Sequence, residues 1–272
     1  MRACWRKLRP RPQRCIIKTA WGDRLAVEPR KFVGAALYMR GVHELAVCEV
    51  LWRLAGPGEQ AVDVGANIGV MTSLLSRRVG AGGRVFAFEP HPDIYRCLEQ
   101  NCRRWGRSNV LCFDCAVSSR NGSARLCEPG IYGENGGTAC LGDGGTGCGF
   151  EVRIVRLDDA LPVGECGVLK IDVEGHELEV LGGAERGFRL GQFRDVVFEA
   201  SWNYPAPAHQ FLLRHGYQIF ALEASRRGPK LVEIPVRSGE LGITVDYLAS
   251  IEPARAKRMM EPPGWQALRE GA

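Results

Sequence analysis

Residues 60–70, QAVDVGANIGV, combine a short apolar run with one aspartate and two glycines four positions apart. An apolar run that leads into a glycine turn and then into the amphipathic segment 70–78 predicts a strand, a tight turn and a helix. This unit is typical of the ligand-binding end of a parallel α/β sheet. The glycine pair therefore raises the question of which nucleotide it accommodates.

The same alternation of strand and helix continues along the chain. We expect strands at 61–64, 84–88, 110–113, 168–173, 196–199 and 217–222, and helices at 45–54, 70–78, 93–104, 177–184 and 208–214. Alternation of this kind predicts parallel strands that are covered by helices on both faces. The expected fold is an open, doubly wound, mostly parallel α/β sheet of the Rossmann-like type. Two short strands around Trp21-Gly22-Asp23 precede it.

Two segments differ from this pattern. The first twenty residues carry seven Arg or Lys and no acid, while the whole chain has a formal net charge of +5. Such a basic arm is either a solvated terminus or a contact for nucleic acid or anionic lipid. Residues 130–149 contain nine glycines. This segment is expected to be either a hairpin or lid beside the carboxyl edge of the sheet, or a surface loop.

Composition sets limits on compartment and metal content. The eleven cysteines are scattered and odd in number in a chain of 272 residues, which favours free thiols. Because no apolar signal-peptide segment follows the basic start, we expect a cytoplasmic location. Cys112-x-x-Cys115 resembles half of a zinc site, but no second pair with matching spacing follows, so we expect no metal. No run approaches the roughly 18 to 20 apolar residues of a bilayer span, and we expect no transmembrane segment.

The glycine turn does not match either of two common phosphate-binding loops. The dinucleotide fingerprint needs a second glycine where this chain has Asn67, and no Gly-Lys-Ser/Thr follows as in a Walker loop. An adenosine ligand without phosphates fits the turn better. Asp63 ends the first strand, Glu89 ends the next strand and is spaced to accept hydrogen bonds from ribose hydroxyls, and Asp114 ends the third strand near the expected adenine. The three acids together indicate S-adenosylmethionine.

Four motifs give the chain a family resemblance. DVGANIG (63–69), FAFEP (86–90), DCAVS (114–118) and above all LKIDVEGHELEVLGGA (169–184) resemble the FkbM family of class I methyltransferases. The resemblance extends from about Gly41 to Tyr247. His43 departs from it, because the family often has an aromatic residue at that position, before Glu44.

The resemblance implies a function and a division of the chain. Such enzymes bind S-adenosylmethionine and commonly methylate hydroxyl groups of sugars, glycolipids or polyketide-like products. We expect a basic arm with short strands at 1–40, a methyltransferase domain at 41–252 with the insert 130–149, and a C-terminal tail at 253–272. The expected cofactor pocket consists of Asp63, Gly65, Asn67, Gly69, Glu89, Asp114 and Ala116.

The motif KIDVEGHE supplies the candidates for catalysis. Lys170, Asp172 and Glu174 alternate with apolar residues, which places the three charges on one face of a strand. Methyl transfer to oxygen requires alignment of the acceptor and a group that takes its proton. Our candidates for the base are Asp172, Glu174 and His176, followed by Glu199.

Several alternatives stay open. Lys170 is also suited to a structural ion pair with Asp172 or Glu199, His176 to the start of a helix, and two carboxylates to Mg²⁺. Trp202 and Tyr204 are candidates for stacking on a sugar ring. We expect a small-molecule or glycan acceptor and no nucleic-acid substrate, since no Asn/Asp-Pro-Pro-Tyr/Phe-like motif for base methylation is present. The alternatives are a nucleic-acid methyltransferase that uses the basic arm and a non-catalytic S-adenosylmethionine-binding module.

Overall fold

A twisted sheet of eight strands forms the centre of the protein. The structure, a computed structural model, describes residues 11–127, 140–142, 149–200, 204–234 and 245–269. Across the sheet the strands run in the order β13 (Gly228–Glu233), β12 (Gln218–Ser225), β14 (Val245–Ser250), β11 (Phe193–Ala200), β10 (Cys166–Ile171), β3 (Gln60–Val64), β4 (Arg84–Phe88) and β5 (Val110–Phe113). The five strands from β11 to β5 are parallel to one another, whereas β14 is antiparallel to both β11 and β12, and β13 is antiparallel to β12.

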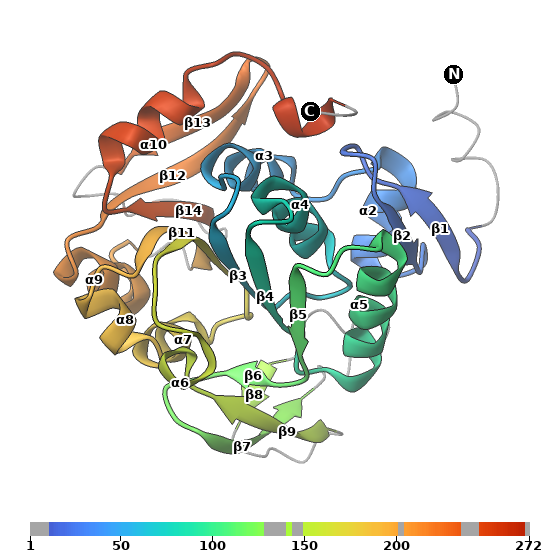
Figure 1. Cartoon of the computed structure of the whole chain (residues 1–272), viewed down its shortest axis with the longest axis horizontal. Helices are drawn as coiled ribbons and strands as arrows, with labels where there is room; N and C mark the ends of the chain where they lie inside the picture. Colours follow the sequence, from blue (N-terminus) through green and yellow to red (C-terminus); the bar gives the residue numbers. More distant parts are fainter. Residues whose placement is uncertain (1–10, 128–139, 143–148, 201–203, 235–244, 270–272) are drawn as a thin grey trace.

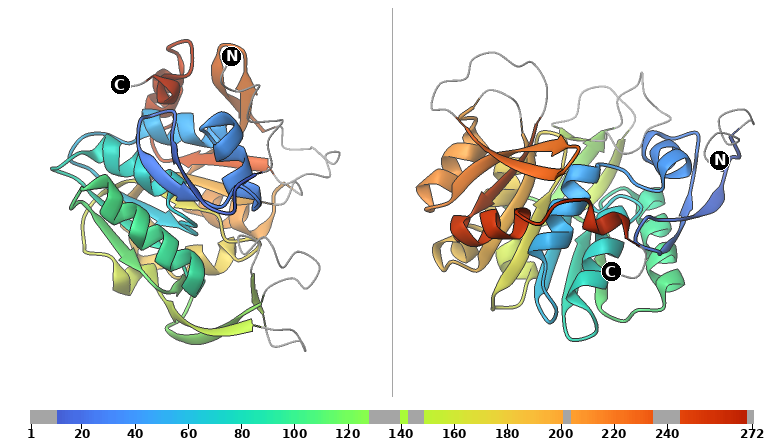
Figure 2. Two further views of the ribbon diagram at one scale, coloured as in Figure 1. Left: turned by 90° about the vertical axis from the view of Figure 1, so that its right-hand side faces the viewer. Right: turned by 90° about the horizontal axis from the view of Figure 1, so that it is seen from above.

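Helices cover both faces of this sheet (Figures 1 and 2). One face carries α3 (Leu45–Leu54) and α4 (Val70–Val79), with α10 (Pro253–Met260) and the short η2 (Gln266–Leu268) packed against α3. The face at the other side of the sheet carries α6 (Leu157–Ala160), α7 (Glu177–Gly182), α8 (Glu185–Arg189) and α9 (Pro207–Arg214). Helix α5 (Pro92–Trp105) lies beside β5 and contacts the N-terminal hairpin.

Two smaller units flank the central sheet (Figure 1). A hairpin of β1 (Cys15–Lys18) and β2 (Arg24–Val27), followed by α2 (Phe32–Arg40), lies at the side of α5. A second sheet has the order β6 (Ala116–Val117), β9 (Gly149–Val155), β7 (Gly122–Cys127) and β8 (Cys140–Gly142). It lies near the carboxyl ends of β4 and β5, where a ligand of the main sheet would be bound.

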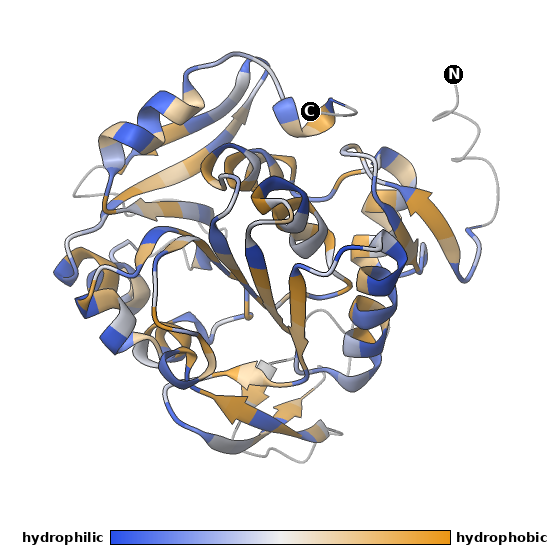
Figure 3. Ribbon diagram, viewed as in Figure 1, coloured by the Kyte–Doolittle hydropathy of each residue, from blue (hydrophilic) through white to orange (hydrophobic). Residues whose placement is uncertain are grey.

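The alternation of side chains along each strand divides the core into two layers. In β3, Ala61 packs with α3 and α4, whereas Val62 and Val64 pack on the other face with Phe86 and Phe88 of β4. Hydrophobic residues dominate the central strands, while helices such as α5 and α10 are polar on part of their surface (Figure 3). Because parallel strands are buried on both faces, they read as nearly continuous apolar runs in the sequence.

The expected fold class is confirmed, and most expected elements lie within a few residues of their observed bounds. The N-terminal hairpin is also present. The strand expected at 168–173 begins earlier, at Cys166, and ends at Ile171; the chain then leaves the strand and bends at Glu174 and Gly175, both of which have a positive φ. The antiparallel strands β13 and β14 and the second sheet had not been predicted.

The ends of the chain are partly built into the fold. The first ten residues of the basic arm lie outside the described residues, as does most of the glycine-rich insert, whose described parts belong to β8 and β9. The buried Arg53 of α3 bonds to Glu49 and donates to the backbone carbonyls of Met260, Pro262 and Gly264. Residues 253–269 are thereby fastened to the core. In the described part of the chain, no helix has the length and apolar character that crossing a membrane requires.

Candidate cofactor and acceptor site

The turn between β3 and α4 depends on two glycines. Gly65 has a φ of 76°, and a Cβ built on it would lie 1.8 Å from the backbone oxygen of Asp172. Gly69 has a φ of 93°, and its Cβ would lie 2.8 Å from Leu98 of α5. Side chains at either position would therefore clash, and both backbone conformations favour glycine. The first glycine lets the end of β10 approach the turn, and the second lets α5 pack against it.

Asn67 and Glu89 complete the turn. Asn67 has a φ of 50°, which non-glycine residues adopt infrequently, and its backbone N–H donates to Glu89 Oε2 at 2.9 Å. Glu89 Oε1 accepts a second backbone hydrogen bond, from His91, at 2.8 Å. Burial raises the pKa of Glu89 to about 7, although these two N–H groups act in the opposite direction. Glu89 is therefore fixed in position, and hydrogen bonds from hydroxyl groups would stabilise its carboxylate.

An open cavity of about 640 Å³ lies in front of this turn. Polar lining comes from Asn67, Glu89, His91 and the turn after β10. The apolar lining consists of Val64, Phe88, Cys115, Ala116, Val117, Leu126, Leu141 and Val173. The second sheet therefore forms one wall of the cavity, and we call the whole the cofactor pocket.

Asp63 has a different place from the one expected, because it does not line the cofactor pocket. The residue is fully buried, accepts a hydrogen bond from the Thr72 hydroxyl at 2.5 Å and lies 3.3 Å from Lys170 Nζ. Lys170 and Asp63 are register partners on adjacent strands. Lys170 Nζ also donates to the Gly65 carbonyl at 2.9 Å. Asp63 therefore stabilises the turn through a lysine of this protein.

Lys170 continues this chain of contacts to Asp172, whose Oδ2 lies 3.3 Å from Nζ. The expected ion pair between Lys170 and Asp172 is thus present. Burial opposes the charge of Lys170, but the carboxylates of Asp172, Asp63 and Glu44 outweigh it and raise its pKa. A buried ammonium with several carboxylate neighbours keeps its charge, because each neighbour favours the protonated form. Lys170 therefore joins the glycine turn to the acidic residues beyond it.

A second cavity, of about 250 Å³, adjoins the cofactor pocket. Asp172 lines both cavities, which places this carboxylate in their shared wall. The remaining lining of the second cavity is Glu44, Val47, Lys170, Ile171, Val197, Phe198, Glu199 and Asp246. We call it the acceptor cavity.

The acceptor cavity holds more carboxylates than cations. Glu199 and Asp246 are register partners on β11 and β14, and neither carboxylate has an ion pair or hydrogen bond with another described residue. Burial raises the pKa of Asp246 to about 7, and the charges of Glu44, Glu199 and Asp172 add to this effect. Like charges on directly opposed strand residues are destabilising. The fold therefore keeps an unfavourable pair of carboxylates at the carboxyl end of β11, beside the acceptor cavity.

The remaining catalytic candidates lie on the turn after β10. Glu174 has a φ of 54°, so the charged face expected for a continuous strand does not extend to it, yet it still lines the cofactor pocket. Partial desolvation of this otherwise exposed side chain raises its pKa to about 7, and Asp172, Glu199 and Glu177 act in the same direction. His176 precedes α7 and also lines the cofactor pocket; its Nε2 lies 3.0 Å from the buried Ser118 hydroxyl. Burial lowers the pKa of His176, against the effect of Glu179.

The third expected acid lies apart from these residues. The Asp114 side chain is 72% exposed and lies 3.6 Å from Arg153, and it does not contribute to the lining of the cofactor pocket, whereas Ala116 does. Gly69 supports the pocket through its packing against α5. Trp202 lies outside the described residues. Among the segments that the structure describes, no group of three or more His, Cys, Asp or Glu is arranged to hold a metal ion.

Sequence reasoning did not identify several lining residues. The His91 side chain accepts a hydrogen bond from the Asp93 N–H at the start of α5. The centroid of its ring lies 5.1 Å from the centroid of the Phe150 ring of β9. Its position directly after Glu89-Pro90 was a signal that could have been used. Leu126, Leu141 and Asp246 gave no local signal, because they reach the site through strands that had not been predicted.

Comparison with known proteins gives two curated relatives of similar identity. The chain is 35% identical over 141 residues to the hexuronic acid methyltransferase AglP of Haloferax volcanii, a match that covers 51% of this chain and 55% of AglP. It is 34% identical over 164 residues to the 31-O-demethyl-FK506 methyltransferase FkbM of Streptomyces tacrolimicus, with 47% of this chain and 60% of the relative covered. The chain thus spans somewhat more than half the length of these relatives.

Solved structures show a more distant similarity. An S-adenosylmethionine-dependent O-methyltransferase from Thermotoga maritima has a TM-score of 0.46 and 14% identity, with 87% of this chain and 77% of the other covered. Residues 63–219 match the family described as "Methyltransferase FkbM domain". This segment is more than half of the chain and contains the glycine turn, Glu89 and the turn after β10. The protein therefore belongs to the FkbM family of S-adenosylmethionine-dependent methyltransferases.

Proposed function

We propose that the protein transfers the methyl group of S-adenosylmethionine to a hydroxyl group of a sugar, glycolipid or natural-product acceptor. The observation that carries this proposal is the position of Asp172 in the shared wall of the cofactor pocket and the acceptor cavity. A methyltransferase needs two adjoining sites with a polar group at their boundary. The names of the two relatives, one for a hexuronic acid and one for an O-demethyl natural product, agree with this class of acceptor.

The residues of the cofactor pocket fit S-adenosylmethionine. Glu89 is held at the pocket wall by two backbone N–H groups and has the carboxylate chemistry to accept hydrogen bonds from ribose hydroxyls. The apolar side chains of Phe88, Val117 and Leu126 offer a surface for the adenine ring. The cofactor supplies a methyl group made electrophilic by the adjacent sulfonium.

The acceptor cavity is suited to a molecule with several hydroxyl groups. Carboxylates accept hydrogen bonds from hydroxyls, and Glu199 and Asp246 have no described partner that competes for them. Both carboxylates are half-buried, so the loss of hydration without a partner costs free energy in the free protein, and a donor from the acceptor would offset that cost. Lys170 fixes Asp172 beside this cavity through the 3.3 Å ion pair.

Two carboxylates are suited to receive the proton of the acceptor hydroxyl. Asp172 is the group in the shared wall, and its position is fixed by Lys170. Glu174 has a pKa of about 7, close to the value that favours a general base at neutral pH. His176 has Nε2 within hydrogen-bond distance of Ser118, so its ring is held at the pocket wall, where it positions the turn that carries Glu174. We therefore rank Asp172 and Glu174 ahead of His176.

Calorimetric titration with S-adenosylmethionine tests the cofactor half of the proposal. Wild type should bind with a dissociation constant on the order of micromolar, whereas Glu89→Ala should bind at least about tenfold more weakly, since a charge-assisted hydrogen bond is lost. Glu99→Ala is the matched control, because Glu99 lies on the exposed side of α5 and pairs with Arg103. NAD serves as the control ligand and should give no heat of binding.

An acceptor screen tests the catalytic half. Sugars, glycolipids and hydroxylated natural products are incubated with the protein and S-adenosylmethionine, and the products are analysed by mass spectrometry for the mass gain of one methyl group in place of a hydrogen. A methyl ether on a hydroxyl acceptor supports the proposal. Methylation of RNA or DNA under the same conditions, with no product from any hydroxyl acceptor, would assign the chain to nucleic-acid modification instead.

A further inference from the structure

Two cysteine thiols from different elements touch each other behind the glycine turn. Cys102 of α5 and Cys112 of β5 have their sulfur atoms 3.4 Å apart, and both side chains are partly exposed. The sequence drew attention to Cys112 through its spacing to Cys115, but the sulfur that Cys112 contacts belongs to Cys102, ten residues upstream. Both side chains pack against a small cluster that contains Ala66 of the glycine turn.

The contact between the two sulfur atoms makes one thiol a hydrogen-bond donor and the other an acceptor, whose thiolate form the contact stabilises. With Cys102 as the donor, the contact lowers the pKa of Cys112 and outweighs burial, whereas the same contact and burial raise the pKa of Cys102. Burial raises the pKa of Cys97, Cys115 and Cys166, so these thiols remain protonated. Thiolates are the nucleophiles in disulfide exchange.

We propose that Cys102 and Cys112 are a redox modification site, which forms a reversible disulfide and thereby weakens cofactor binding. The oxidant is a low-molecular-weight disulfide such as oxidised glutathione. The Cys112 thiolate attacks one of its sulfur atoms and releases one equivalent of thiolate. Cys102 then loses its proton, attacks the Cys112 sulfur of the mixed disulfide and releases the second equivalent of thiol. Two electrons pass from the cysteine pair to the oxidant, and an excess of thiol reverses both steps.

The positions of the two cysteines connect this bond to the cofactor pocket. A disulfide needs the sulfurs at about 2.05 Å, so α5 and β5 must move closer or their side chains must rotate within a packed cluster. Asn101, next to Cys102, is fully buried and donates to the carbonyl of Ile68 in the glycine turn at 2.9 Å. Beyond β5, Cys115 and Ala116 line the pocket. Movement of the cysteine pair would therefore displace both the glycine turn and the segment 115–116, which form two walls of the cofactor pocket.

Disulfide formation is measured first, on the full chain. The reduced protein is equilibrated in buffers with increasing ratios of oxidised to reduced glutathione, remaining thiols are alkylated, and proteolytic peptides are identified by mass spectrometry. We expect a peptide that links Cys102 to Cys112 in wild type and in Cys97→Ser, and none in Cys102→Ser or Cys112→Ser. Cys97 is the matched control, since it lies on the same helix and is also partly buried. Absence of the linked peptide from oxidised protein whose circular dichroism is native would overturn the assignment.

Cofactor affinity is then measured on the oxidised and reduced forms. This part rests on the proposed function, whereas disulfide formation does not. We expect the oxidised wild type to bind S-adenosylmethionine about tenfold more weakly, within the usual range of coupling between two sites, and dithiothreitol to restore the affinity. Cys112→Ser should bind equally in both buffers. An oxidised, linked protein with unchanged affinity would overturn the regulatory role, whereas a reduced protein that binds no S-adenosylmethionine would overturn the proposed function instead.

Discussion

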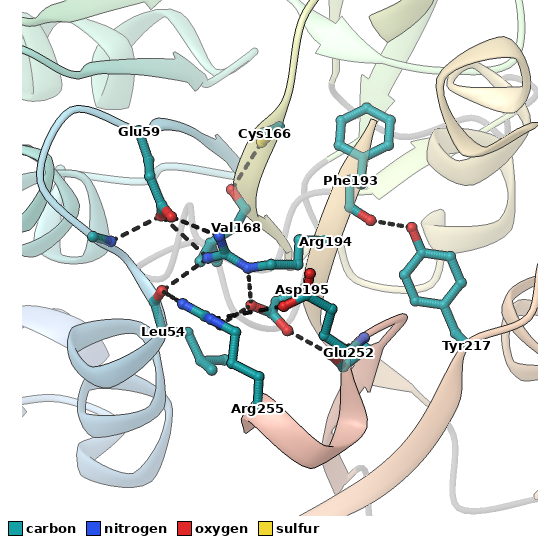
Figure 4. Close-up of polar contacts among 12 residues, drawn as sticks. Leu54, Glu59, Cys166, Val168, Phe193, Arg194, Asp195, Tyr217, Glu252 and Arg255 are labelled. Carbon is teal, nitrogen blue, oxygen red and sulfur yellow. Dashed lines mark hydrogen bonds and ion pairs between the residues drawn. The ribbon is translucent and has the colours of Figure 1, made fainter. Parts of the chain in front are cut away.

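Charged residues lie at both ends of strands β10 and β11. Only at the amino end does each of them have an oppositely charged partner. At the amino end, Asp195 accepts hydrogen bonds from Arg194 at 2.9 Å, Arg255 at 3.0 Å and Ser250 at 2.7 Å, and Arg194 also pairs with Glu59 at 2.6 Å (Figure 4). Both arginines donate in addition to the Leu54 carbonyl. Every charge of this cluster has an opposite partner, and the cluster joins β11, α10 and the loop before β3.

At the carboxyl end, one lysine faces a surplus of acids. Lys170 pairs with Asp63 and Asp172, and Glu44 lies 3.0 Å from His43, while Glu199 and Asp246 line the same cavity without an ion pair to another described residue. Buried charges without partners cost free energy, which a protein recovers only when a ligand meets them. The contrast therefore separates a structural cluster from a functional one on the same two strands.

Removal of Lys170 should have the largest effect on stability. In Lys170→Met the fully buried Asp63 loses its ion pair, and we expect the free energy of unfolding to fall by about 3 kcal/mol or more. Arg194→Met is the matched change at the amino end, and its loss should be smaller because Asp195 keeps Arg255 and Ser250. Urea unfolding of both variants measures the difference. Equal losses would contradict the contrast between the two ends, and recovery in Lys170→Met with Asp63→Asn would support it.

Removal of the candidate bases should affect turnover more than binding. Asp172→Asn or Glu174→Gln should lower kcat by more than about 100-fold, the scale of one general base, while calorimetry shows S-adenosylmethionine still bound. Asp195→Asn is unsuitable as a control because it breaks the structural cluster. Glu99→Gln, on the surface of α5, controls for loss of one carboxylate. Unchanged turnover in both site variants would remove these residues from the chemistry.

The surplus of acids predicts a pH dependence of stability. Asp246 has a pKa of about 7 in the folded protein, above its ordinary value, so the folded state binds this proton more tightly than the unfolded state. Its favourable contribution is complete below the ordinary pKa and is lost as the pH rises through about 7. Asp246→Asn should therefore raise the free energy of unfolding by about 1 kcal/mol at pH 8 and change it little at pH 4. The gain at pH 8 is small because water partly screens the carboxylate. An equal gain at both pH values would show that ionisation of Asp246 is not the cause.

The sequence predicted the local part of this site better than the part that depends on strand order. The strand, turn and helix around Gly65 and Gly69 follow from residues that are neighbours in the chain, as does the spacing to Glu89. For an ion pair of Lys170 the sequence left Asp172 and Glu199 open as partners, and the structure has the pair with Asp172. The contact of Lys170 with Asp63 requires β10 to lie beside β3, and no local pattern specifies which strands are neighbours.

Long-range antiparallel pairing explains the other omissions. Glu199 and Asp246 meet only because β14 inserts between β11 and β12, although it is distant in sequence from β11. The second sheet pairs β7 with β9 across the glycine-rich insert, for which the composition left a hairpin or lid and a surface loop open. Asp114 ends its strand as expected, but strand position alone does not fix the direction of a side chain that pairs with Arg153.

Substitution of Ser118 should have the smallest effect. It compares a paired polar contact with the unpaired acids at the same, carboxyl end of the strands. The buried Ser118 hydroxyl lies 3.0 Å from His176 Nε2 and is a paired polar contact beside the unpaired acids. Ser118→Ala removes one hydrogen bond, worth about 0.5 to 1.5 kcal/mol, so we expect kcat to fall about two- to tenfold with little change in cofactor affinity. Ser118→Thr, which keeps the hydroxyl, is the matched variant. A structural contact should leave the pH dependence of kcat unchanged, whereas a shifted pH profile in Ser118→Ala, reversed in Ser118→Thr, would promote His176 above the two carboxylates as the base.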